Sequence, residues 1–357
     1  MADAGCTAPD TEAPDHPGPS WTRVFTIVSI VIAAVALAIT VWSVGPHQLV
    51  SQLSSIGIGF AGVLAVEVLV TLCDSRAIYG FLGHGGRRCP PYLHVVRAQV
   101  TGRAINAVTP LGSLGEAAKA TTLMERTSSR RAIAAVLHYN LAIIGVRLIT
   151  IVVGAPVCAL VLDLPHALAI GLYAGSLVSA MALIAGMLIV KRGTLVSLVD
   201  AGRAIHVLSK ARADAWRARV KDIDRQPLRG GARSRSRWAP TGWIVLSRIL
   251  TLGELWIVLR SVGYTAGPGT VAAIATAGSL IGAISSIVPM GLGISEGSNA
   301  ALFAALGAPA SLGVTMVIGQ RITLIVYAII GLVLMGASTA IDARGRRTTV
   351  PAPTASP

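Results

Sequence analysis

The sequence predicts an all-α polytopic membrane protein. Hydrophobic residues make up 53% of the 357 residues and charged residues only 13%, a composition that departs from soluble domains toward integral membrane proteins. Several apolar runs approach the length of about 20 helical residues that crosses a bilayer. A Pro-Gly-Gly-Glu pattern also occurs twice inside apolar sequence. Together these observations predict about six spans plus two re-entrant helical hairpins, arranged as an inverted repeat.

The apolar segments divide the chain into one membrane domain and two tails. Residues 1–20 are polar and rich in Pro, Gly, Ser and Asp, and we expect a disordered N-terminal tail there. We expect a transmembrane domain over residues 21–340 and a disordered C-terminal tail over residues 341–357. The spans are expected at 24–44, 56–72 with a continuation to 82, 132–153, 168–190, 241–259 and 312–336.

The repeated pattern interrupts helices at residues 109–116 and 288–296. Proline removes a backbone donor and glycine loosens a helix, so each copy is expected to break one. No uninterrupted apolar run within residues 94–124 spans the hydrocarbon core of about 30 Å, which predicts two half-helices that reach the midplane and return. The same pattern predicts a second hairpin over residues 270–307. Residues 270–288 are also long enough to cross completely, so eight full spans are the alternative.

A strongly basic segment fixes the expected topology. Between Lys191 and Arg237 the chain carries 13 Lys or Arg against four Asp, which predicts a cytoplasmic loop over residues 191–238. Counting spans from this loop places both termini in the cytoplasm. The first hairpin then opens to the cytoplasm and the second to the opposite face. Many secondary transporters use such an inverted repeat to form a binding site at the midplane.

The basic loop has two further interpretations. Its apolar residues fall mostly at helical spacing among Arg and Lys, which is typical of a helix lying on an anionic leaflet. The alternative is that its charge only sets topology. We expect no nucleic-acid binding, because the loop is tethered at the membrane and its segment from Lys191 to Arg237 carries a single Phe, Tyr or Trp, which is Trp216.

Glu116 and Glu296 end the two patterns and begin the returning half-helices. An acid in the first turn of a helix stabilises it by about 0.3 to 1 kcal/mol, which is the purely structural interpretation. An ionisable residue inside a membrane is costly and is a functional candidate by default. We expect the two glutamates to approach one another near the midplane.

Five basic residues are expected at or near membrane depth. Arginine suits bidentate recognition of phosphate, and half-helix N-termini also favour anions, so an excess of positive charge predicts a phosphate-bearing substrate. The alternative is that these cations pair internally with Glu67, Asp74, Glu254 and the two motif glutamates. The candidate substrate-binding residues are Arg103, Asn106, Pro110, Gly115, Glu116, Lys119, Arg147, Arg248, Pro289, Gly291, Gly293, Glu296 and Arg321.

The sequence indicates no catalytic residue, metal site or cofactor. There is no phosphate-binding loop of the Gly-x4-Gly-Lys type, and the four cysteines form no CxxC or Cys/His cluster. We therefore do not expect an enzyme.

The pattern of Asn106, Pro110 and residues 115–119, followed by residues 289–296 and Arg321, resembles the lysylphosphatidylglycerol synthase transmembrane, or flippase-like, family. The resemblance covers roughly residues 20 to 340. It implies a polytopic module that moves a lipid across the bilayer after a separate soluble domain has aminoacylated it. No globular sequence follows Arg347, so we do not expect lipid synthesis.

Two departures from that family concern the substrate. Relatives commonly have an Arg shortly before the Gly-Glu pair and another three residues after the Glu. This chain has Gly112 and Ser113 in the first region and Lys119 at the second position. The resemblance therefore implies a substrate that differs from that of the best-known members.

Two functions follow from the sequence. The first is an integral lipid translocase of the cell membrane, which moves an anionic or aminoacylated phospholipid through a polar groove between the two hairpins. The second is a non-transporting scaffold that recruits or regulates a separate envelope lipid or glycan enzyme.

Overall fold

Regular structure is entirely helical in the residues that the computed structural model describes, which are 57, 59–83, 90–108, 114–161, 165–192, 235–261, 263–285 and 294–347. The predicted all-α class is therefore confirmed for these residues. In chain order the helices are α3 (Gly59–Leu82), α4 (Tyr92–Val108), α5 (Leu114–Met124), α6 (Ser129–Val161), α7 (His166–Arg192), α10 (Arg235–Ser261), α11 (Pro268–Ser285), α12 (Ile294–Ala305) and α13 (Ala310–Arg347).

Four of these helices are long and apolar enough to cross a membrane: Ser129–Val161, Leu168–Leu188, Trp238–Ser261 and Ala310–Gly331. They coincide with four of the predicted spans. Helix α3 has 24 residues, a length of about 36 Å, but it carries Glu67, Asp74 and Arg76. The predicted span at 24–44 lies outside the described residues. Large aliphatic side chains on α6 and α7 are exposed, as expected for a lipid-facing surface.

Helix α6 is longer than predicted and continues through Pro156. Proline has no N–H, so the carbonyl of Val152, four residues earlier, loses its partner in the helix. The hydroxyl of Ser176 on α7 donates to this carbonyl at 3.1 Å. The neighbouring helix thus satisfies the freed backbone group, which is the usual condition for a proline inside a membrane helix.

Two pairs of short helices form hairpins at the positions of the sequence pattern. In the first, the ring of His94 on α4 bonds the carbonyl of Thr122 on α5 at 2.8 Å, and the side chain of Asn106 accepts from the backbone N–H of Gly115 at 2.8 Å. These contacts show that α4 and α5 are antiparallel. The second pair is α11 and α12, which also contact each other. The connecting residues, including Pro110, Pro289, Gly291 and Gly293, lie outside the described residues.

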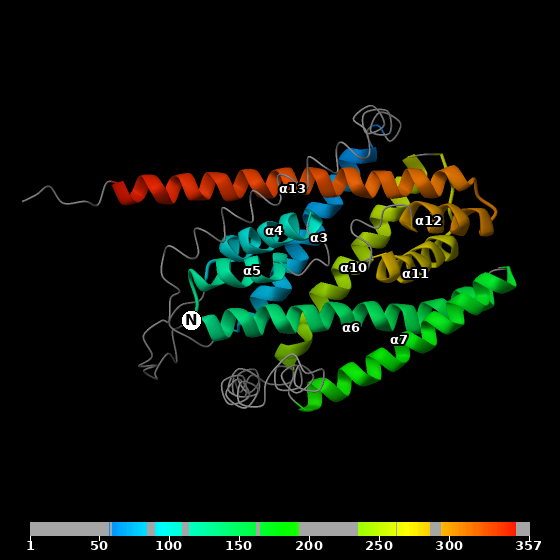
Figure 1. The fold of residues 1–357 in the computed structure, drawn as a ribbon, viewed down its shortest axis with the longest axis horizontal. Coiled ribbons are helices and arrows are strands. Elements are labelled where there is room, and N and C mark those ends of the chain that lie inside the picture. Colours follow the sequence, from blue (N-terminus) through cyan, green and yellow to red (C-terminus); the bar gives the residue numbers. More distant parts are fainter. Residues whose placement is uncertain are drawn as a thin grey trace, which may run out of the picture.

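The two hairpins open toward opposite ends of the molecule (Figure 1). The α4–α5 pair opens toward the end where α13 finishes, and the α11–α12 pair opens toward the end where α13 begins. Each hairpin is preceded by one long helix and followed by another: α3 and α6 in the first half, α10 and α13 in the second. The halves therefore contain the same order of elements in opposite orientation.

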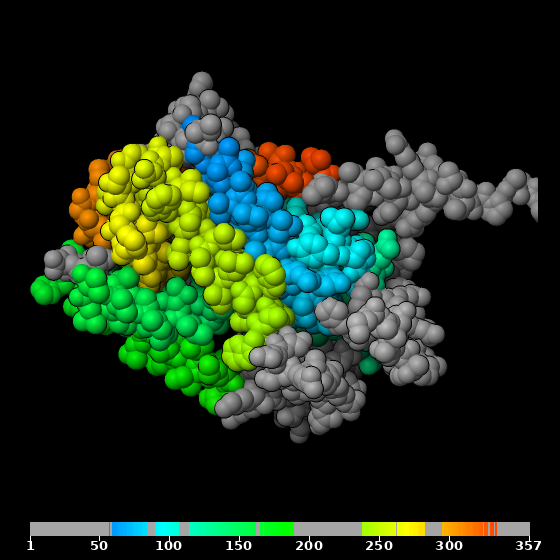
Figure 2. Space-filling model, turned by 180° about the vertical axis from the view of Figure 1, so that it is seen from behind, coloured from blue at the N-terminus to red at the C-terminus, as the bar shows by residue number. Residues whose placement is uncertain are grey.

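Contacts between the halves are reciprocal. Helices α3 and α10 pack along each other, and they lie side by side on one face of the molecule (Figure 2). Helix α13 packs on α4, as α6 packs on α11. Small residues allow both of the latter contacts, because Gly331 lies against Ala104 and Gly154 lies against Thr276. Such a pattern is expected of two repeats related by a pseudo-two-fold axis.

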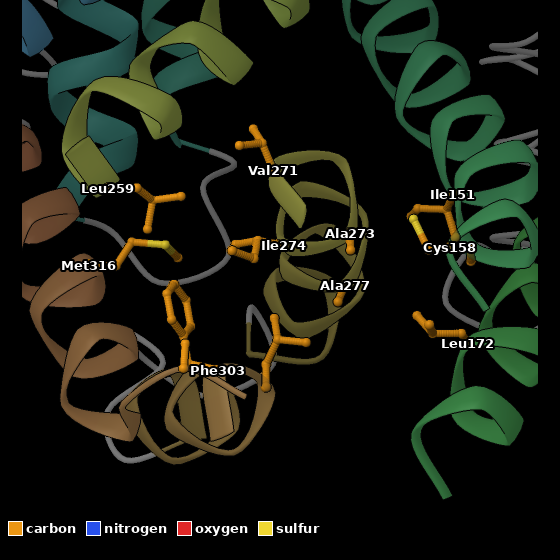
Figure 3. Close-up of a cluster of buried hydrophobic side chains, with 13 residues drawn as sticks. Ile151, Cys158, Leu172, Leu259, Val271, Ala273, Ile274, Ala277, Phe303 and Met316 are labelled. Carbon is orange, nitrogen blue, oxygen red and sulfur yellow. The ribbon is translucent and has the colours of Figure 1, made fainter. Parts of the chain in front are cut away.

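Each hairpin has its own apolar core. One cluster joins α4 and α5 to α3, α6 and α10, and its fully buried members include Leu123 and Ile244. The other joins α11 and α12 to α6, α7, α10 and α13. In the second cluster Phe303 of α12 points toward Ile274 of α11 and lies near Met316 of α13 (Figure 3). Each hairpin is thus held between long helices.

Helix α13 extends past the predicted start of the C-terminal tail. Helix α13 continues to Arg347, seven residues into the segment 341–357 that was expected to be disordered. Residues 341–347 contain Ala, Ile and Arg, which are compatible with helix, so the last span extends into its basic flank without a break.

Close packing at the first hairpin predicts the effect of a small substitution. A Cβ at Gly115 would meet the backbone oxygen of Gly102 and the side chain of Asn106. We expect Gly115→Ala to lower the free energy of unfolding by about 1 to 3 kcal/mol, as overpacking does. Gly145 of α6 has open space around it and provides the control, since Gly145→Ala should be neutral or stabilising. Thermal unfolding in detergent measures both, and equal midpoints would contradict the packing argument.

Candidate functional site in the polar interior

Glu116 is the centre of a four-residue cluster at the first hairpin. It lies in the first turn of α5. Its Oε1 accepts from Nδ2 of Asn106 at 2.9 Å and from Nζ of Lys119 at 2.8 Å. Its Oε2 accepts from Nδ2 of Asn140 on α6 at 2.7 Å. Three helices therefore donate to one carboxylate, which is much more than a helix cap requires.

Lys119 is the most deeply buried cation of this cluster, with 3% of its surface exposed. Besides the ion pair with Glu116, its Nζ lies 5.2 Å from the ring centroid of Tyr139. The hydroxyl of Tyr139 accepts from the side-chain amide of Gln99 at 3.3 Å. The aromatic ring and the carboxylate together compensate the ammonium group for the loss of water.

Arg103 links three helices. Its guanidinium forms an ion pair with Glu67 of α3 and donates to the hydroxyl of Thr71 at 2.8 Å. It also lies 5.0 Å from the ring centroid of Tyr327 on α13, and the hydroxyl of Thr71 is 3.4 Å from that of Tyr327. The arginine therefore joins the first hairpin to one long helix from each half.

The contact between α3 and α10 also contains charge. Asp74, with 2% exposed surface, accepts from the hydroxyl of Ser247 at 2.8 Å and pairs with Arg248 at 3.4 Å. Glu254, farther along α10, lies near the charges of Glu67, Arg103 and Arg248. Within the described ranges, Glu254 has no hydrogen bond or ion pair of its own.

The second hairpin repeats the arrangement of the first with other residues. Glu296 lies in the first turn of α12 and pairs with Arg321 of α13 at 2.5 Å. In the first hairpin the corresponding long helix, α6, contributes Asn140 to Glu116. Each motif glutamate thus binds a side chain of the long helix that follows its hairpin. Glu116 and Glu296 form ion pairs with different cations, Lys119 and Arg321.

Four of the five cations that were expected at membrane depth have acid partners within the described residues. Arg103, Lys119, Arg248 and Arg321 each form an ion pair with an acid. These pairs follow from the cost of an unpaired charge away from water. The alternative of internal pairing therefore describes four of the five cations. Helices α3, α5, α10 and α12 contribute five acids: Glu67, Asp74, Glu116, Glu254 and Glu296.

Arg147 differs from the other four cations. It lies on α6 with its side chain exposed, and its Nη2 is 3.4 Å from the carbonyl oxygen of Ser279 on α11. The same guanidinium also lies beside Gly282. Arg147, in the first half of the chain, therefore contacts the C-terminal part of α11 in the second hairpin. It has no acid partner in the described part of the molecule.

The structure adds residues that the sequence interpretation did not place in the site. Asn140 donates to Glu116, and the ring of Tyr139 lies beside Lys119. Gln99 donates to Tyr139, and Thr71 accepts from Arg103 and contacts Tyr327. An amide inside an apolar span is a detectable signal for Asn140. Tyr and Thr are common in membrane helices, so the sequence alone could not distinguish the remaining residues from others of the same type.

This arrangement defines a class of protein: a multi-pass helical membrane protein built from two inverted repeats around a paired polar interior. The chain matches the lysylphosphatidylglycerol synthase TM region family over residues 26–331. The protein belongs to this family, as the sequence resemblance implied. No curated protein and no solved structure matches the chain. Within the described residues, no three His, Cys, Asp or Glu side chains are grouped to hold a metal ion.

The ion pair between Arg103 and Glu67 provides a test of the interior charges. Arg103→Met leaves a largely buried carboxylate without its cation, a change that costs about 3 to 5 kcal/mol. We expect a lower thermal midpoint in detergent. The double variant Glu67→Met/Arg103→Met should recover most of the loss because no charge remains unpaired. Arg126→Met, at an exposed position after α5, is the control. A double variant no more stable than Arg103→Met would contradict the pairing argument.

Proposed function

We propose that the protein is a lipid translocase, in which a phospholipid headgroup passes between the two hairpins while its acyl chains stay in the bilayer. The supporting observation is the pair of oppositely oriented hairpins, each with a first-turn glutamate bound to a side chain of the following long helix. A polar interior formed by α3, α4, α5, α6, α10 and α13 lies beside exposed apolar helix faces. A headgroup and its acyl chains need these two environments.

Helix lengths favour a re-entrant arrangement in the bilayer. Helix α5 has 11 residues and α12 has 12, which correspond to about 16 and 18 Å, roughly half of the hydrocarbon thickness. Both returning helices would then start near the midplane. The basic loop at 191–238 supports a cytoplasmic position for both termini by the positive-inside rule, in the plasma or inner membrane.

The balance of charge favours a headgroup that carries both signs. A phosphate can replace a glutamate as the partner of Lys119 or of an arginine, and an ammonium group can replace a cation as the partner of a glutamate. When one headgroup carries both groups, the two exchanges together leave no charge unpaired, whereas one exchange alone leaves the displaced glutamate or cation without its partner. An aminoacylated phospholipid has both groups, and an anionic phospholipid has the first. In this proposal the protein moves the lipid without modifying it, and a separate enzyme would attach the amino acid.

Transport by the purified protein tests the proposal. Liposomes containing the protein and a headgroup-labelled phosphatidylglycerol, or its lysyl derivative, are treated with an impermeant reductant that destroys the label in the outer leaflet. We expect the wild-type protein to expose the inner-leaflet label. Glu116→Ala and Glu296→Ala should slow exposure about tenfold or more, since a hydrogen bond to a charged group contributes about 1.5 to 3 kcal/mol.

Glu125→Ala is the matched control, because Glu125 is exposed in the turn that follows α5. Its transport rate should equal that of the wild type. Wild-type liposomes that behave like empty ones would overturn the proposal. If neutralising the arginines of the 191–238 loop abolished function in cells while Glu116→Ala and Glu296→Ala had no effect, the scaffold function would be favoured instead.

A further inference from the structure

A groove on the outer surface lies apart from the ion-paired residues of the interior. It has a volume of about 540 Å³ and opens between α3, the start of α4 and the first third of α10. These three helices share one face of the molecule (Figure 2). The lining residues are Leu69, Leu72, Cys73, Arg76, Tyr79, Tyr92 and Trp243.

Arg76 is the charged residue of this groove. Its guanidinium lies 5.2 Å from the ring centroid of Tyr79, and its side chain is exposed. Arg103, Arg248 and Arg321 each have a carboxylate partner, whereas the described residues provide none for Arg76. The N–H groups of its guanidinium can therefore bind an anion that does not belong to the described residues.

The aromatic residues of the groove are fixed in place. Tyr79 and Tyr92 meet edge to face, with ring centroids 6.0 Å apart. The hydroxyl of Tyr92 donates to the backbone carbonyl of Leu72 at 2.8 Å, which ties the start of α4 to α3. The groove therefore has a preformed wall, so a ligand does not have to order it.

The position of the groove corresponds to the edge of the membrane. Arg76 lies in the last two turns of α3, which ends at Leu82, and Tyr92 is the first residue of α4. Tyr and Trp concentrate at the level of lipid headgroups, and arginines there contact phosphates. The topology proposed above places this end of α3 at the cytoplasmic leaflet.

The opposite end of the groove is apolar and open. Leu69 and Leu72 are 49% and 37% exposed. They continue from the arginine toward the middle of α3, along the direction in which an acyl chain extends from its headgroup. Trp243, which is 39% exposed, lies across from the last turns of α3, because Gly80 of α3 meets Pro240 of α10 and Asp74 binds Ser247. A cation at the headgroup level followed by an exposed apolar surface suits one phospholipid molecule better than a soluble anion.

We propose that this groove binds an anionic phospholipid of the cytoplasmic leaflet, with its phosphate on Arg76, the start of its acyl chains beside Trp243 and one acyl chain along Leu72 and Leu69. The assignment of the leaflet rests on the topology in the proposed function, but the binding does not depend on transport. The lipid would stay on the outer surface of the protein, apart from the cluster around Glu116.

Fluorescence quenching tests this site. A variant that retains Trp243 and has its other tryptophans replaced by Phe is placed in nanodiscs with brominated phosphatidylglycerol or brominated phosphatidylcholine. We expect about a fivefold preference for quenching by the anionic lipid, the contribution of one arginine near the membrane surface. Arg76→Gln should remove this preference. Soluble glycerol phosphate should not reduce quenching, because it has no acyl chain.

Arg260→Gln is the matched control. Arg260 also lies over an aromatic ring, 5.5 Å from the centroid of Trp256, but it belongs to the other end of α10. It should keep the preference. Equal quenching by the two lipids, no quenching by either, competition by glycerol phosphate or a preference that survives Arg76→Gln would each overturn the proposal. The measurement does not require translocation, so a failure of the transport assay would leave its outcome unchanged.

Discussion

The cost of an unpaired charge away from water is the constraint on which this structure depends. The interior contains acids and bases at depths where each would destabilise the fold by several kcal/mol if it were alone. Eight of them form four ion pairs, and each pair joins different helices, except that of Lys119 and Glu116 within α5. Asn140 extends that cluster to α6. The pairs of Arg103 and Arg321 and the bond of Asn140 therefore also connect the hairpins to the long helices.

Pairing also has a consequence for transport. A site with free cations would bind an anion tightly and would release it slowly. A site whose charges already have partners can accept a headgroup only by exchange of those partners, so binding and release differ little in energy. Such a balance suits a protein that passes a lipid between leaflets, in the way that a channel binds an ion strongly enough to admit it and weakly enough to release it.

Much of the fold could be predicted from the sequence, because length and hydropathy restrict what can cross a bilayer. Proline and glycine marked the two hairpins, since α4 ends at Val108, just before the first predicted break, and α11 ends at Ser285, just before the second. The length of α6 was underestimated because Pro156 normally ends a helix. Only the structure shows that Ser176 satisfies the carbonyl that this proline frees.

The candidate site was predicted less completely. The motif glutamates and four cations that pair with acids were identified, but the sequence could not decide between internal pairing and an open anion site. That choice depends on distances between helices far apart in the chain, such as the one that brings Arg321 to Glu296. Tyr139 and Thr71 were missed for the same reason. Their role comes from the neighbour that the fold provides.

The orientation of the two hairpins tests the account most directly. Single cysteines are introduced at Ser128, after the first hairpin, and at Ala310, after the second, in a chain whose own cysteines are replaced. Both positions are exposed. An impermeant maleimide is then applied to either face of oriented vesicles. It should label Ser128→Cys and Ala310→Cys from opposite faces. A third variant, Ser113→Cys, should not react from the face that labels Ala310→Cys. The inverted repeat would be contradicted if Ser128→Cys and Ala310→Cys were labelled from one face. If Ser113→Cys were labelled from the face that labels Ala310→Cys, α4 and α5 would cross the bilayer completely.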